Sequence, residues 1–283
     1  MCEFFVLRHV VYLMFQLCRE TTAHAFHIPA DFDCTFVNLG LGALLLNYAH
    51  SPALFQAWSK NNTNFVQAIA MLKKYAYRSH SGNLDNGMVD PRTFFYIRDY
   101  FYQMEAENKN GAFVMTWTLN LTENRKTADN YAMPFNTNNI DLTVCSNVIY
   151  GLTSAVLAGL GNPKEWFDAD IQMIYENTTD LLVWQIERNF SGRPDIALTY
   201  YPSVLNFYWF TARTLNLIQS YVKNDNDSLP FPVIDTVGNR LLDMMQNVVT
   251  PVVVKMASPG KRNHTVYFDE FLGDSDRDIS GRV

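Results

Sequence analysis

Long apolar runs alternate along this chain with runs in which apolar residues recur every three or four positions. The runs 36–48, 144–160 and 204–222 are apolar on nearly every side, and the similar run 94–104 carries one arginine and one aspartate. Helices that are apolar all round belong inside a protein, so these runs predict buried inner helices. The segments 65–77, 166–190 and 233–249 mix apolar with charged or amide residues and predict outer helices with one face in solvent.

An aspartate followed by a threonine precedes the inner runs at similar spacing. The four threonines are Thr35, Thr93, Thr143 and Thr199, which are 58, 50 and 56 residues apart. Aspartate and threonine are ordinary helix N-caps, but capping does not explain the even spacing. A period of this length is typical of arrays of helical hairpins. We therefore expect an all-α fold, an (α/α) toroid-like array of hairpins with fewer helices than a closed ring needs.

One segment departs from the helical pattern. Residues 113–121 (FVMTWTLNL) alternate β-branched, aromatic and polar side chains, which predicts a short β-like excursion from the array. The chain after residue 272 is polar and predicts a loose tail. The expected organisation is one helical domain over residues 1–272, followed by a tail over residues 273–283.

Composition narrows the classes of function. The net charge is −6, and the densest basic spots are the pairs Lys73-Lys74 and Lys261-Arg262, so we expect no nucleic-acid partner. No apolar stretch is long enough to predict a transmembrane span. Aromatic residues make up 14% of the chain, which indicates either a thick core or a cavity lined with rings.

The compartment is predicted from glycosylation sequons. Six sequons occur, at Asn61, Asn120, Asn177, Asn189, Asn226 and Asn263, several of them in polar, turn-like stretches. They favour secretion or the lumen of the secretory pathway. The apolar run 10–18 and the sequence Ala-His-Ala at 23–25 are shaped like a signal peptide, but charged residues interrupt the pattern. A buried first helix is the favoured interpretation of that run.

The stretch Asp31-Phe32-Asp33-Cys34-Thr35 resembles a known motif. It is similar to the Asp-x-Asp-Asp-Thr motif of the class II terpenoid cyclases, which are α/α-toroid proteins. The resemblance implies that Asp33 is a general acid that protonates an alkene or epoxide, with Asp31 helping to hold its acidic form. Cys34 stands where the family has a further aspartate, and a thiol cannot do the work of that carboxylate.

The same positions lead to a candidate site. If the ring closes, the starts of the inner helices converge on one central cavity and bring together Asp31, Asp33, Asp141 and Asp195. Carboxylates that share a cavity raise one another's pKa, as an acid/base site requires. The ligand expected there is a small apolar molecule or a carbohydrate. No cofactor is expected, and the spacing of His24 and His27 gives only a weak metal signal.

Two other classes of function fit the pattern. Carbohydrate-active α/α-barrel enzymes combine paired carboxylates with aromatic platforms, for which Trp117, Tyr131, Tyr200, Tyr201 and Trp209 are candidates. A non-catalytic binding or scaffold module is the third hypothesis. It predicts that the aspartates act as helix caps, whereas a carbohydrate enzyme predicts an open groove with two carboxylates.

Overall fold

The computed structural model describes residues 30–47, 52–127, 137–224, 228–262 and 264–268. These residues are mostly helical, as the sequence pattern predicts, and they include two small antiparallel sheets. The longer helices are α2 (Phe32–Asn47), α3 (Pro52–Asn61), α4 (Phe65–Tyr75), α5 (Pro91–Ala106), α7 (Leu142–Leu157), α9 (Ala169–Glu187), α11 (Val204–Lys223) and α12 (Pro232–Met244). The shorter ones are α6 (Leu121–Thr127), α8 (Pro163–Trp166), η1 (Asn189–Gly192), α10 (Pro194–Ala197), the π-helix η2 (Met245–Val249) and α13 (Thr250–Met256).

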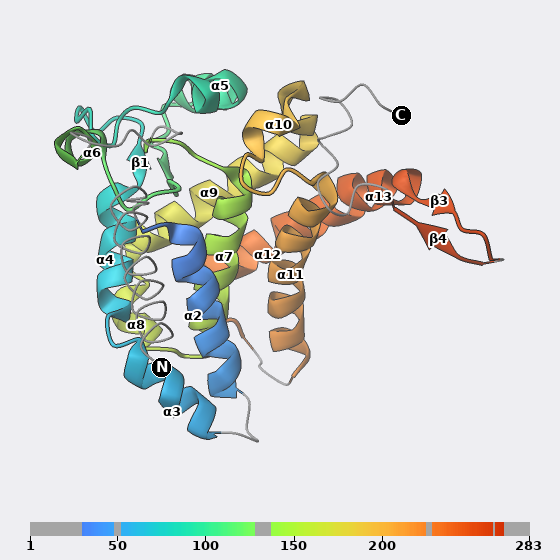
Figure 1. Ribbon diagram of the computed structural model, residues 1–283, viewed down its shortest axis with the longest axis horizontal. Helices are drawn as coiled ribbons and strands as arrows, with labels where there is room; N and C mark the ends of the chain where they lie inside the picture. The colour runs from blue at the N-terminus through green and yellow to red at the C-terminus, as the bar shows by residue number, and fades with distance from the viewer. Residues whose placement is uncertain (1–29, 48–51, 128–136, 225–227, 263, 269–283) are drawn as a thin grey trace, which may run out of the picture.

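The helices form two layers. In the inner layer, α7 lies between α2 and α11 and has its most extensive contacts with these two helices (Figure 1). In the outer layer, α4 and α12 flank α9, which packs on the back of α7. The three inner helices run in the same direction. Hydrogen bonds join the residues at their N-terminal ends, and their C-terminal parts line one groove. The described residues show the two layers but no closed ring.

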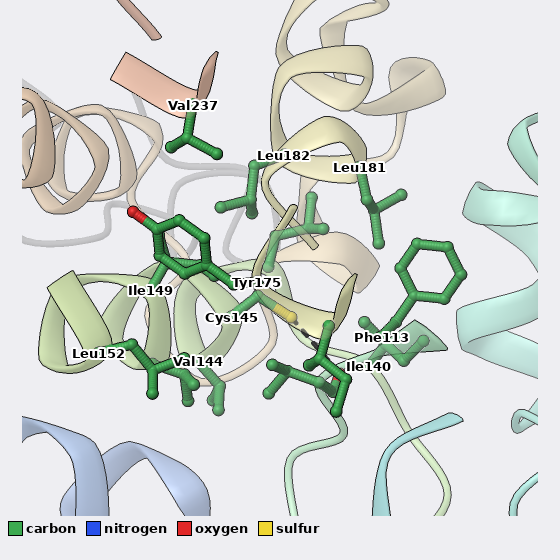
Figure 2. Packing of buried hydrophobic residues seen from close by; sticks show 14 of the residues in the cluster. Phe113, Ile140, Val144, Cys145, Ile149, Leu152, Tyr175, Leu181, Leu182 and Val237 are labelled. Carbon is green, nitrogen blue, oxygen red and sulfur yellow. Dashed lines mark hydrogen bonds between the residues drawn. The ribbon is translucent and has the colours of Figure 1, made fainter. Parts of the chain in front are cut away.

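Helix α7 lies at the centre of the core. Asp141 caps its N-terminus, and nearly all of its sixteen residues are buried. Figure 2 shows the apolar side chains of α7 packed against α9 and against Val237 of α12. The predicted run 144–160 is therefore confirmed as an inner helix that is apolar on every side because it is covered on every side.

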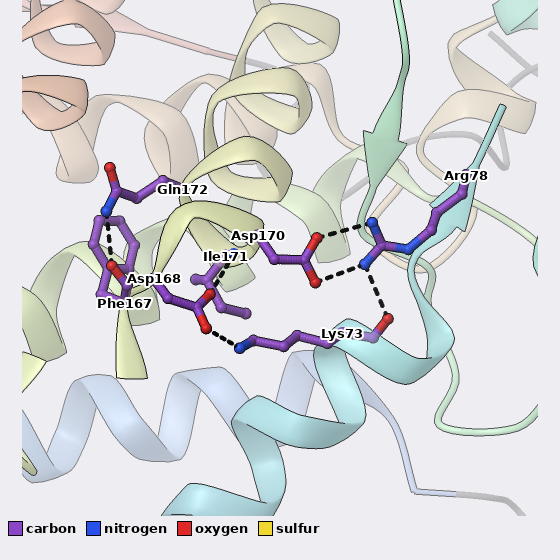
Figure 3. A network of polar contacts seen from close by, with 7 residues as sticks. All are labelled: Lys73, Arg78, Phe167, Asp168, Asp170, Ile171 and Gln172. Carbon is purple, nitrogen blue, oxygen red and sulfur yellow. Dashed lines mark hydrogen bonds and ion pairs between the residues drawn. The ribbon is translucent and has the colours of Figure 1, made fainter. Parts of the chain in front are cut away.

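A network of charged groups joins α4 to the start of α9 in the outer layer (Figure 3). Arg78 donates two hydrogen bonds of 2.9 Å to Asp170, and Lys73 pairs with Asp168, which also caps α9. These side chains are partly exposed, so each ion pair contributes at most about 1 kcal/mol. The network therefore adds little stability, and its main effect is to orient α4 and β1 relative to the start of α9.

The prediction that the runs 36–48 and 204–222 are buried on every side is wrong. Helix α2 exposes Val37, Leu41 and Leu44 on one face, and α11 exposes Trp209. Both helices lie at the edges of the inner layer, and their described neighbours leave these faces uncovered. An apolar residue pattern cannot distinguish a helix covered on all sides from one that presents an apolar face at an edge.

The predicted repeat is also interrupted. Helix α5, expected as an inner helix, instead has its main contacts with α10, η1 and α9 at one end of the layers. Asp90 caps α5 by accepting a 2.6 Å hydrogen bond from the backbone of Thr93. Capping therefore accounts for this aspartate, and the spacing of 58 and 50 residues does not place α5 beside α7.

The segment 113–121 forms less strand than predicted. Strand β2 (Ala112–Phe113) pairs antiparallel with β1 (Tyr77–Arg78), and a single bridge joins Trp117 to Asp31. The second sheet, β3 (Ser258–Pro259) with β4 (Val266–Tyr267), was not predicted. The apolar run 10–18, the two histidines at 24 and 27 and the tail 273–283 lie outside the described residues.

Candidate functional site

Backbone hydrogen bonds join the chain that leads into α2 to the segment 116–118. The backbone N–H of Phe32 donates to the carbonyl of Thr116 at 2.9 Å, and that of Thr118 donates to Ala30 at 2.9 Å. The carboxylate of Asp31 accepts a 2.6 Å hydrogen bond from the backbone of Cys34, which is the geometry of an N-cap. Asp31 is therefore used at the start of α2, and the predicted β-like segment holds it there.

Asp33 lies one step further on and faces the neighbouring inner elements. Its Oδ2 accepts a 2.6 Å hydrogen bond from the hydroxyl of Tyr201, and its Oδ1 accepts one from the amide of Asn147 on α7. Burial, followed by the hydrogen bond to Asp33, raises the pKa of Tyr201 above its usual range. The tyrosine therefore stays protonated as a donor, and both oxygens of Asp33 are occupied by protein groups.

Arg213 on α11 completes this polar cluster. It donates to the side-chain oxygen of Asn147, so the amide of Asn147 joins the arginine to Asp33. Its guanidinium carbon lies 4.0 Å from the ring centre of Tyr150, and the rings of Phe210 and Trp209 follow at 4.9 and 5.2 Å. Burial lowers the pKa of Arg213, but a guanidinium keeps its charge at neutral pH. The cluster thus holds one carboxylate and one cation joined through an amide.

Asp141 is the most deeply buried of the predicted aspartates. One oxygen accepts hydrogen bonds from the backbone of Thr143 and Val144, at 2.8 and 3.1 Å, and from the Thr143 hydroxyl. The other oxygen accepts a 3.2 Å hydrogen bond from the backbone of Tyr200. Burial is the largest influence and raises the pKa of Asp141 to about 6 although these donors act in the opposite direction. Asp141 thereby ties the start of α7 to the segment that precedes α11.

Asp195 does not join the other three aspartates. It lies in the first turn of the four-residue helix α10, where Arg193 donates to both of its oxygens at 2.8 and 2.7 Å in an exposed ion pair. Arg193 lowers the pKa of Asp195. Helix α11 is instead capped by Ser203, whose hydroxyl accepts from the backbone of Asn206. The expectation of four carboxylates that face one cavity is therefore not met.

A groove lies between the C-terminal parts of the three inner helices. Its volume is about 220 Å³, and its mainly apolar walls include Gly40, Leu44, Tyr150, Ser154, Leu157 and Leu217. Residues three or four apart on a helix share a face. On α7 the groove residues therefore share a face with Asn147, and on α11 Leu217 lies one turn beyond Arg213. We call this space the inner groove. The polar cluster of Asp33, Asn147, Tyr201 and Arg213 lies towards its N-terminal side, and Tyr150, which lines the groove and contacts Arg213, is common to both.

A second groove of about 440 Å³ lies between α5, α9 and α12. Its lining includes Glu176, Asp180 and Glu187 of α9 together with the ring of Trp184. Arg240 of α12 pairs with both Asp180 and Glu176. Burial raises the pKa of Asp180. This is an open groove with carboxylates and an aromatic ring, but one arginine already pairs with two of the acids.

The sequence prediction missed several members of these sites. Asn147 and Tyr150 look like ordinary positions of an apolar helix. Arg213 had a readable signal, because it is the only charged residue between positions 204 and 222. In the described part of the chain, no group of three or more histidine, cysteine or acidic side chains could hold a metal ion. No helix in that part is long and apolar enough to cross a membrane.

No family model, no curated protein and no solved structure matches this chain. The site must therefore be interpreted from its own geometry.

Proposed function

We propose that this protein is a non-catalytic binding module of the α/α-toroid type, which holds a small, largely apolar molecule in the inner groove. The observation that supports the proposal is the groove itself, an apolar channel that lies along α7 where a ring of hairpins would have its central cavity. Ligand sites are typically concave and apolar with a few polar groups at defined places. The polar cluster at one end supplies such groups.

The arrangement of Asp33 favours binding over acid catalysis. A general acid must direct its proton at the substrate, within hydrogen-bond reach of the atom that receives it. Both oxygens of Asp33 instead accept hydrogen bonds from Tyr201 and Asn147. Asp31 serves as a cap, and Cys34 occupies the place of the third acid of the cyclase motif. The cyclase-like hypothesis is therefore the less favoured one.

The carbohydrate-enzyme hypothesis has its best support in the second groove, which combines carboxylates with Trp184. A glycosidase needs one acid and one base free to face the scissile bond from either side. Arg240 instead holds Asp180 and Glu176 together on one side of the groove. This geometry favours a structural role for the pair.

The proposal is tested with 1-octanol, a neutral apolar probe, in a titration followed by NMR chemical shifts. Leu44 lines the inner groove and is 63% exposed, so Leu44→Asp should leave the fold intact. It places a charge beside the probe, and we expect octanol to bind at least about tenfold more weakly. The matched control is Leu54→Asp, on a 51% exposed leucine of α3 outside the groove. Equal octanol affinity in Leu44→Asp and wild type would contradict the proposal.

We further propose that the protein is secreted. The exposure of each sequon then predicts which of them carry glycans. Asn61 at the end of α3 and Asn189 after α9 are exposed. Asn177 is partly buried beside the second groove and donates to the carbonyl of Asn110, while Thr179 of its sequon is fully buried. Glycans require accessible surface positions.

Expression through a secretory pathway should therefore give a chain with N-linked glycans at Asn61 and Asn189. Mass spectrometry of Asn61→Gln should show the loss of one glycan, whereas Asn177→Gln should leave the glycan mass unchanged. A chain that reaches the medium without any N-linked glycan, or one that loses mass in Asn177→Gln, would refute this prediction.

A further inference from the structure

We infer that the inner groove takes an amphipathic anion, with its acidic head group on Arg213 and its apolar tail along α7. This inference rests on the proposed binding function and names the chemical class of the ligand. It starts from Arg213, a half-buried cation whose surroundings within the described residues leave its charge incompletely satisfied.

Arg213 has no direct counterion in the described part of the chain. None of the ion pairs among those residues involves it. The charge of Asp33 acts on it from a distance, and the hydrogen-bonded path between the two runs through the amide of Asn147. Its Nε is buried and has no hydrogen-bond partner among the described residues. A buried charge without a paired group is costly. An anion bound beside the guanidinium would supply the counterion that Arg213 lacks.

The aromatic rings around Arg213 restrict how such an anion can approach. Tyr150, Phe210 and Trp209 stand over the guanidinium at 4.0 to 5.2 Å from their ring centres, as in cation–π contacts. These rings crowd the guanidinium and limit the directions from which an anion can approach it. The N–H groups of an arginine edge form a planar fork that matches a carboxylate or a phosphate. The head group should therefore be planar or tetrahedral and oxygen-based.

The tail has a path of suitable chemistry. The ring of Tyr150 contacts Arg213 and also lines the groove, and Leu217 lies one helical turn from Arg213 on the same face of α11. From there the walls are mainly apolar as far as Leu157 and Leu44. A volume of about 220 Å³ exceeds the ~150 Å³ of a cavity that holds benzene. A chain of a few to several methylene groups fits such a space.

Asp33 sets the strength of anion binding. Its negative charge lies on the far side of Asn147 and opposes a second anion near Arg213. The inner groove should therefore bind an anionic amphiphile with moderate affinity in the wild type. Asp33→Asn, which removes this charge, should therefore raise the affinity for an anion relative to that for a neutral molecule.

The experiment compares octanoate, 1-octanol and octylamine, which share an apolar tail and differ in head-group charge at neutral pH. Dissociation constants are measured by NMR titration of the folded chain. We expect octanoate to bind about tenfold more tightly than octanol, and octylamine to bind most weakly. Arg213→Gln should abolish the preference for octanoate, and Arg213→Lys, which keeps the charge but loses the planar fork, should retain only part of it. Arg188→Gln is the matched control, because Arg188 also lies over an aromatic ring, 4.9 Å from Trp184, outside the groove.

The possible outcomes separate the two proposals. If octanoate and octanol bind equally to the wild type, or Arg213→Gln keeps the preference, the anion inference is overturned while the binding function stands. If none of the three probes binds, the proposed function fails and the inference fails with it. Circular dichroism and thermal melting of each variant establish that it is folded. If Arg213→Gln does not fold, the effect of Asp33→Asn on octanoate against octanol still decides the question.

Discussion

Replacing Asp141 by asparagine should make the free energy of unfolding less dependent on pH. The wild-type chain should lose about 3 kcal/mol of stability through this carboxyl as pH rises from about 4 to about 6, and the variant should not. Burial raises the pKa of this carboxyl from 3.8 to about 6. In the unfolded chain the group releases its proton near the ordinary value. Between these two pH values the folded state therefore binds more protons than the unfolded state, so the free energy of unfolding falls as pH rises.

Asparagine suits this position because it caps helices about as well as aspartate and carries no charge. Its oxygen can still accept from the backbone of Thr143 and Val144. Its NH₂ group cannot accept the hydrogen bond that Tyr200 donates, which costs about 1 kcal/mol at every pH. The variant should therefore have a lower free energy of unfolding than the wild type at pH 4, and should lose less of it between pH 4 and pH 7.

Urea unfolding of both chains at several pH values measures the slopes. The raised pKa of Asp180 keeps a residual slope of the same sign in both chains. Asp195→Asn is the control, because Arg193 lowers the pKa of that exposed carboxyl and its small contribution has the opposite sign. Parallel stability curves for wild type and Asp141→Asn would show that the buried carboxyl does not titrate in this range.

Gly151→Val should destabilise the fold by about 3 kcal/mol, because it forces α2 away from α7. A Cβ at position 151 would lie 2.2 Å from the carbonyl oxygen of Phe36 and 2.8 Å from its carbonyl carbon, and these backbone atoms of α2 cannot move without the helix. Among the described helices, α2 and α7 share the most extensive contact, and it is formed at this place. The separation would also pull Asp33 from Asn147 and disrupt the polar end of the inner groove.

The matched control is Gly238→Ala, since Gly238 also lies inside a helix. There the nearest atom to an added Cβ is the Cγ2 methyl carbon of Ile218 at 3.1 Å, a side-chain atom that needs to give way by only a few tenths of an ångström. Alanine is the better helix former by up to about 1 kcal/mol, so this change should be neutral or slightly stabilising. Denaturant midpoints compare the two variants, and equal stability of Gly151→Val and wild type would rule out the close approach of α2 and α7.

Part of the site was visible in the sequence and part was not. Asp31, Asp33 and Asp141 were predicted at the starts of inner helices, and all three lie there. Their roles were not readable, because a cap and a catalytic acid look alike until the donors are placed. Asp33 accepts from Tyr201, 168 residues away, and from Asn147, 114 residues away. No local pattern encodes such partners.

The sequence by itself determined the helices, because the period of apolar residues and the capping aspartates act over a few residues of chain. It also marked the runs that form α2, α7 and α11 as inner helices, without distinguishing the central one from the two at the edges. Only the tertiary structure showed that α5 lies outside the inner layer and that α2 and α11 expose apolar faces. The exposure of a helix face depends on which helices pack beside it. The same packing brought Gly151 against the backbone of α2 and placed Arg213 beside Tyr150, which lines the inner groove. Both contacts join segments that are far apart along the chain.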